Sequence, residues 1–101
     1  MAASKQDIRA WFRAGLAGGS THMIVVCDTF DHEDYPVFVP VGQDVRTKAA
    51  EYDGPNMQKV MEVYAMHLPM EMQLAQPRSF HYELPEPKTR PTVYDRLLKD
   101  D

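Results

Sequence analysis

Apolar positions near the start of the chain recur at the spacing of an amphipathic helix. These positions are Ile8, Trp11, Phe12 and Leu16. Intervals of three and four residues place side chains on one face of an α-helix. Ser4 with Asp7 has the form of an N-terminal capping pair, and Gly18 with Gly19 supplies a helix stop. The pattern therefore predicts a helix that begins after Ser4 and ends at Gly18.

Two short apolar runs come next, and they flank a strongly acidic stretch. Residues 22–27 are almost continuously apolar and β-branched, as in a strand that is covered on both faces. Residues 35–41 alternate between valines on one face and Phe38 on the other. The acidic residues 28–34 between the runs predict the link of an antiparallel hairpin. Because prolines lie near both ends of the second run, we expect it at the edge of the sheet.

A second helix is predicted over residues 42–53. Val45, Ala49 and Tyr52 lie at intervals of four and three, and Gly54 with Pro55 comes directly after residue 53. Glycine next to proline is a strong stop signal. We therefore expect a short helix that ends at residue 53.

Residues 57–68 fit two different periods. As a helix they place several apolar residues on one face, and as a strand they alternate. The strand interpretation puts Val60 with Tyr64 on one face and Met61 with Val63 on the other. We favour the strand, because an isolated hairpin needs a third strand to be stable in water.

The chain after Pro69 is rich in proline, with Pro77, Pro85, Pro87 and Pro91 close together. They restrict the region around residues 79–82 to a short extended piece. Residues 92–101 can form one or two helical turns. The sequence thus predicts an α+β fold with an antiparallel sheet of about three strands, two or three helices and a Pro-rich tail. We expect a compact domain over residues 1–76 and an extended tail over residues 77–101.

Composition and charge exclude several classes of protein. With 101 residues the chain is long enough for one domain. Its formal net charge of -4 argues against a partner that is a long nucleic acid. No apolar run reaches the roughly 20 residues that cross a bilayer. A single cysteine, Cys27, and a charged N-terminal stretch without the form of a signal peptide predict a cytoplasmic protein.

The acidic stretch is a candidate metal site. Asp28, Asp31 and Asp34 offer carboxylate oxygens, the ligands that Mg²⁺ and Ca²⁺ prefer. A metal-binding module or a metal-dependent hydrolase is therefore one hypothesis. The favoured interpretation is a solvated loop whose acids keep the hairpin soluble. A haloacid-dehalogenase-type Asp-x-Asp motif fails, because Phe30 occupies the place of its second carboxylate.

The residue pattern favours binding over catalysis. The four histidines are scattered, and no nucleophile, phosphate-loop or dinucleotide motif is present. We therefore expect a protein that is not an enzyme and needs no cofactor. Aromatic rings together with basic side chains are the groups that hold nucleotides. The candidate ligand-binding residues are Arg9, Trp11, Arg13, Arg46, Lys48 and Tyr64.

The partner that these residues favour is a small nucleotide. Seven methionines in so short a chain also favour an adaptable surface and a homo-oligomer. A purely structural or assembly protein is the third hypothesis, and it predicts a stable oligomer that responds neither to nucleotides nor to divalent cations.

Two stretches of the chain carry a family resemblance, residues 22–39, HMIVVCDTFDHEDYPVFV, and residues 56–64, NMQKVMEVY. On these residues the chain resembles, over roughly residues 5–82, a family of small proteins from bacteriophages and prophage-bearing bacteria. It implies no activity and transfers no site residues. A phage context implies a protein that acts against host defence, either by sequestering a cyclic or modified nucleotide signal or by covering a host protein.

Overall fold

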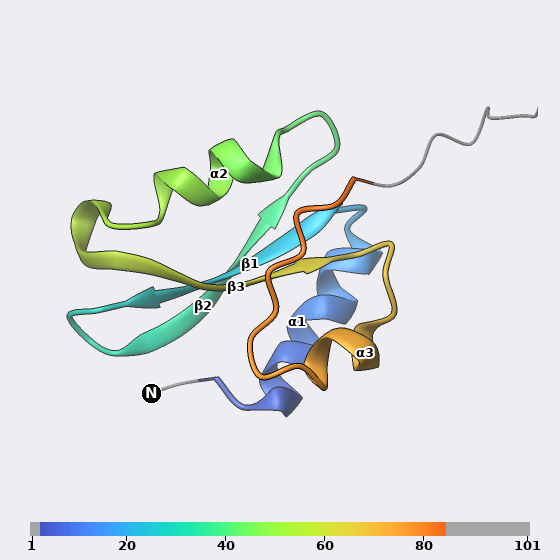
Figure 1. Ribbon diagram of the computed structural model, residues 1–101, viewed down its shortest axis with the longest axis horizontal. Coiled ribbons are helices and arrows are strands. Elements are labelled where there is room, and N and C mark those ends of the chain that lie inside the picture. Colours follow the sequence, from blue (N-terminus) through green and yellow to red (C-terminus); the bar gives the residue numbers. More distant parts are fainter. Residues whose placement is uncertain (1–2, 85–101) are drawn as a thin grey trace, which may run out of the picture.

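The computed structural model describes residues 3–84, which form three helices, one 3-10 turn and three strands (Figure 1). The helices are α1 (Lys5–Ala17), α2 (Val45–Glu51) and α3 (Met70–Leu74), the turn is η1 (Pro55–Met57), and the strands are β1 (His22–Asp28), β2 (Glu33–Val39) and β3 (Gln58–Ala65). The predicted α+β class is confirmed. No helix within residues 3–84 is long and apolar enough to span a bilayer.

The sheet is antiparallel in the order β2-β1-β3. The predicted hairpin is confirmed, with His22 opposite Val39 and Asp28 opposite Glu33. The second strand lies at an edge, as its prolines indicate, although it begins and ends two residues earlier than predicted. Val41 consequently lies outside the strand and is 77% exposed. Strand β1 lies between the other two strands, and its residues from His22 to Val26 are all buried.

The alternation of side chains on β1 divides the core into two layers. Met23 and Val25 pack with α1 and α3 on one face, while Ile24 and Val26 pack with α2 on the other face. Figure 1 shows the same arrangement, with the sheet between α2 and the pair α1 and α3. A strand covered on both faces must be apolar at every position, which explains the continuous apolar run in the sequence.

Strand β3 is a strand, as predicted, but its alternation is interrupted. The register between β1 and β3 shifts at Val25 and Val26 of β1. Val60 and Val63 therefore share the α2 face, and Met61 packs with Tyr64 on the α1 face. A bulge places one extra residue in a strand and reverses the facing of the residues beyond it. The predicted faces of this strand were wrong for that reason.

Helix α1 begins and ends as its sequence predicts. The Ser4 hydroxyl accepts a hydrogen bond from the Asp7 amide at 3.1 Å, and the Asp7 carboxylate accepts one from the Ser4 amide at 3.1 Å. Gly18 is the C-cap, and Gly19 has a φ of 79° that favours glycine. Leu16, predicted on the buried face, is 51% exposed, because the buried position of this last turn is Gly15 instead.

The chain after β3 differs most from the expectation. Helix α3 was not predicted, and α2 covers only part of the expected range 42–53. Ser79 is fully buried and Phe80 forms a parallel bridge with Val63 of β3. The packed fold therefore continues beyond residue 76, the predicted end of the compact domain. The helical turns predicted for residues 92–101 lie outside the described residues.

Candidate functional site

A hollow of about 460 Å³ lies between α2, β3 and the segment that comes after α3. We call it the basic pocket. Its lining residues are Arg46, Ala49, Ala50, Asp53, Lys59, Val60, Arg78, Phe80 and Tyr82. The volume is within the range of about 300–1,000 Å³ that is usual for small-molecule sites.

One wall of the basic pocket is formed by α2 and the residues that follow it. Arg46 and Ala50 lie four residues apart on one side of α2, and Asp53 comes just beyond the end of that helix. Val45 and Ala49 pack on the sheet and fix the helix in place. The orientation of α2 on the sheet thus places Arg46 at the pocket.

The opposite wall is the edge segment, residues 78–83. Its backbone is extended, so Arg78, Phe80 and Tyr82 point to the same side, and all three line the basic pocket. The Ser79 carbonyl accepts a hydrogen bond from the Val63 amide at 2.8 Å, and the His81 amide donates to the Val63 carbonyl at 2.9 Å. The edge segment therefore acts as a short fourth strand beside β3.

Two cations of the basic pocket lie against aromatic rings. The guanidinium carbon of Arg46 is 4.4 Å from the centre of the Tyr82 ring, and that of Arg78 is 5.4 Å from the centre of the Phe80 ring. Both distances are typical of cation–π contacts. Arg78 also donates to the Met61 carbonyl at 3.2 Å. With Lys59, the lining carries three cations and one carboxylate, so it favours anions.

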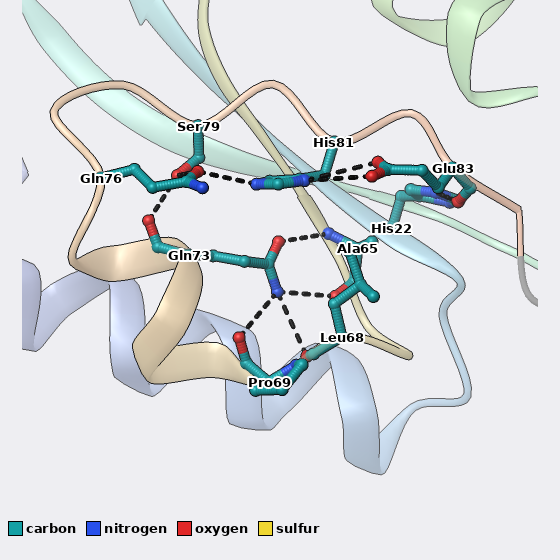
Figure 2. A network of polar contacts seen from close by, with 9 residues as sticks. All are labelled: His22, Ala65, Leu68, Pro69, Gln73, Gln76, Ser79, His81 and Glu83. Carbon is teal, nitrogen blue, oxygen red and sulfur yellow. Dashed lines mark hydrogen bonds and ion pairs between the residues drawn. The ribbon is translucent and has the colours of Figure 1, made fainter.

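Polar contacts hold the edge segment from behind (Figure 2). The Ser79 hydroxyl donates to the Gln73 carbonyl, and the His81 ring nitrogen Nε2 lies 2.8 Å from the Gln76 side-chain oxygen. Buried His22 donates from Nε2 to the Glu83 carbonyl at 2.7 Å. A carbonyl can only accept, so this nitrogen carries the proton. These bonds fix the wall that presents Phe80 and Tyr82.

The six residues proposed for ligand binding are divided between the two faces of the sheet. Arg46 lies in the basic pocket, and Lys48 lines a separate shallow depression beside α2 with Asp44 and Thr47. Arg9, Trp11 and Arg13 belong to α1 on the opposite face.

Arg9 and Trp11 have other partners there. Arg9 donates to Glu71 at 2.8 and 3.0 Å, and Trp11 packs against the core. The predicted set therefore does not form one site.

Tyr64 is not available for stacking. Its side chain is 1% exposed and meets the Phe12 ring edge to face. Its hydroxyl donates to Glu62 at 2.8 Å. Burial raises the pKa of this hydroxyl, because the charged form would be poorly solvated. Tyr64 is a core residue, and its predicted role as a stacking ring is wrong.

The acidic stretch does not converge into a metal site. Asp28 accepts hydrogen bonds from the amides of Phe30 and Asp31 at 2.9 and 3.3 Å, and Asp34 accepts one from the Ala3 amide at 2.9 Å. Within residues 3–84 no group of three or more histidine, cysteine or acidic side chains is placed to hold a metal ion. Asp28 therefore organises the hairpin turn. The proposed metal set Asp28, Asp31 and Asp34 is not supported.

Sequence reasoning overlooked most of the pocket lining. The unrecognised polar and aromatic residues are Asp53, Lys59, Arg78, Phe80 and Tyr82. The sequence did contain a sign of this wall, because Arg78, Phe80 and Tyr82 alternate as on one face of a strand. The prolines on both sides of this segment argued against a strand there.

No protein-family model matches the chain, and neither does any curated protein or solved structure. The phage resemblance therefore stays a prediction, and any proposal of function rests on the basic pocket itself.

Proposed function

We propose that this protein binds a small nucleotide in the basic pocket and retains it without chemical change. The observation that supports this proposal is the convergence of Arg46, Lys59 and Arg78 with two aromatic rings around one hollow. Guanidinium groups bind phosphate oxygens through paired, charge-assisted hydrogen bonds. Aromatic and guanidinium planes stack on bases. A nucleotide carries both kinds of group in one molecule.

The size and charge of the molecule favour a single nucleotide over a polymer. A hollow of about 460 Å³ suits a ligand of drug-like size. The chain as a whole is acidic, with a formal net charge of -4. Long nucleic acids require an extended basic surface that displaces counterions. The local excess of cations at the pocket is therefore suited to a compact anion.

Retention, rather than turnover, is consistent with the chemistry of the lining. Within residues 3–84, the ionisable side chains of the lining are three cations, Asp53 and the Tyr82 phenol, and the lining includes no cysteine, serine or histidine. Such a set binds phosphate and base but offers no activated nucleophile. In the phage context that the sequence resemblance implies, a protein of this kind would lower the concentration of a cyclic or modified nucleotide signal of host defence.

Titration calorimetry with 3′,5′-cyclic AMP, 3′,5′-cyclic GMP and the 5′-monophosphates tests the proposal. We expect binding by the wild type and a loss of about tenfold or more in affinity for Arg46→Ala and for Lys59→Ala. A hydrogen bond to a charged group contributes roughly 1.5–3 kcal/mol, and 1.4 kcal/mol corresponds to a factor of ten.

Arg13→Ala is the matched control, because this exposed arginine lies on α1 at the other face of the sheet. It should leave the affinity unchanged. Absence of binding heat with every nucleotide, or equal losses for Arg13→Ala and Arg46→Ala, would contradict the proposal.

A further inference from the structure

Asp53 is the carboxylate of the basic pocket, and none of the three cations neutralises it. Within residues 3–84, no ion pair joins Asp53 to Arg46, Lys59 or Arg78, although all four line the same hollow. Opposite charges that share a pocket without touching leave space for a ligand between them. The ligand must then offer negative charge to the cations and hydrogen-bond donors to the carboxylate.

The side chain of Asp53 is held in a defined position. Its Oδ1 accepts a hydrogen bond from the Val60 amide at 3.2 Å. The Gly54 amide donates to the Gln58 carbonyl at 2.7 Å and closes the adjoining turn. Gly54 has a φ of 110°, a conformation that favours glycine. Among the described residues, the Val60 amide is the donor to this carboxylate, so one lone pair of Oδ1 and both lone pairs of Oδ2 remain to accept from a ligand.

We propose that Asp53 selects guanine, so that the ligand of the basic pocket is a guanine nucleotide; this inference rests on the proposed nucleotide-binding function. An ionised carboxylate only accepts hydrogen bonds, whereas arginine and lysine only donate. The lining thus provides donors for phosphate and one strong acceptor for the base. The negative charge of Asp53 also repels phosphate, which orients the base toward the carboxylate.

The four common bases differ in what they present to a carboxylate. Guanine offers two adjacent donors, N1–H and the N2 amino group, which match the two oxygens of Asp53. Adenine and cytosine each offer one amino group next to an acceptor nitrogen, which the carboxylate repels. Uracil offers one N–H between two carbonyl oxygens. A site that hydrogen-bonds a specific N–H rejects analogues that lack it, so guanine is the base that this acceptor favours.

Calorimetry at one ionic strength with GMP, IMP, AMP, CMP and UMP tests the selection on the wild-type protein. We expect GMP to bind at least about tenfold more tightly than AMP, CMP or UMP, as a good bidentate base contact provides. IMP lacks only the N2 amino group and should bind more weakly than GMP. Equal affinities for the five nucleotides would overturn guanine selection and leave nucleotide binding intact.

The variant Asp53→Asn gives a second, independent test. Asparagine keeps a side-chain oxygen for the Val60 amide and replaces the other oxygen with a donor. We expect GMP to bind about tenfold more weakly and the preference for GMP over AMP to disappear. Asp31→Asn, an exposed acid of the β1–β2 turn, is the control and should keep both affinities.

The outcomes separate this inference from the proposed function. If GMP keeps its full preference in Asp53→Asn with an unchanged melting temperature, Asp53 is not the selecting residue. If Asp53→Asn fails to fold, the comparison of GMP with IMP and AMP on the wild type still decides. If no nucleotide binds the wild type at all, the proposed function is wrong, and guanine selection is overturned with it.

Discussion

Gln73 replaces a neighbouring strand with its side chain. It is fully buried, and its Oε1 accepts from the Ala65 amide at 2.8 Å while its Nε2 donates to the Ala65 carbonyl at 2.9 Å. These are the two hydrogen bonds that a paired strand residue would make. Nε2 also lies within 3.2 and 3.3 Å of the carbonyls of Leu68 and Pro69. The side-chain amide of Gln73 therefore provides hydrogen-bond partners for the backbone at the end of β3 and in the turn into α3.

Substitution of this residue tests that role. Gln73→Leu should lower the free energy of unfolding by roughly 2–4 kcal/mol, because it leaves the buried amide and carbonyl of Ala65 without partners. Urea unfolding measures the change. Gln43→Leu, at an exposed position, is the control and should stay within about 0.5 kcal/mol of the wild type. A similar small change for Gln73→Leu would contradict the role.

His22 should make stability depend on pH. It is fully buried, and burial, opposed by the bond to the Glu83 carbonyl and aided by nearby His67, lowers its pKa below the ordinary value of 6.5. The unfolded chain therefore binds a proton more readily than the folded one near pH 6, so stability rises with pH there. The contribution of His22 should be fully present above about pH 6.5 and lost as the pH falls through the folded-state pKa.

Urea unfolding at about pH 7.5 and about pH 5.5, on either side of the ordinary histidine pKa, measures this dependence. The loss of stability on acidification should be smaller in His22→Asn, which cannot take up the proton. An identical loss in both proteins would show that other groups cause it.

At the scale of elements, the outer edge of β3 is covered along its second half. Arg78 donates to Met61, the edge segment pairs with Val63, and Gln73 pairs with Ala65. Exposed strand edges pair with other chains and lead to aggregation. The opposite edge strand, β2, instead carries Pro36, which has no amide to donate. The same cover that protects β3 also forms a wall of the basic pocket.

Release of that cover should open the pocket locally. Ser79→Ala removes the hydroxyl that bonds to the Gln73 carbonyl. We expect faster amide hydrogen exchange at Val63 and His81, with unchanged protection at Ile24 in β1, because local opening needs less free energy than global unfolding. Ser20→Ala, outside this network, should change none of these rates. Unchanged exchange at His81 would contradict the proposed cover.

At the scale of the whole molecule, the sheet separates two surfaces, one over α1 and α3 and the other over α2 (Figure 1). On the first surface, the exposed ion pair of Arg9 and Glu71 connects α1 with α3. The hydrogen bond from Arg9 lowers the pKa of Glu71. The surface over α2 carries the basic pocket. Since surface ion pairs contribute little to stability, the pair of Arg9 and Glu71 should add little to the stability of the fold.

Arg9→Gln should therefore change neither the stability of the fold nor the affinity of the basic pocket. Its melting temperature and its affinity for GMP should both match the wild type, as measured by thermal unfolding and calorimetry. A loss of GMP affinity in Arg9→Gln comparable with that in Arg46→Ala would place the ligand on the α1 face instead.

Features that depend on near neighbours in the chain could be predicted from the amino-acid order alone. The capping pair of Ser4 and Asp7, the apolar run of β1 and the prolines of β2 each act within a few residues. Periodicity and capping are local properties, so helix α1, the β1–β2 hairpin and its edge position were accessible. One site residue, Arg46, was also recognised from its charge.

The pocket and the cover of β3 depend on tertiary packing. The bulge in β3 changed which side chains face α2, and a side-chain amide on α3 took the place of a strand partner. Arg46 meets Tyr82 only because α2 and the edge segment pack on the same face of the sheet. Contacts between distant segments have no period in the sequence, because they depend on how the layers pack around β1.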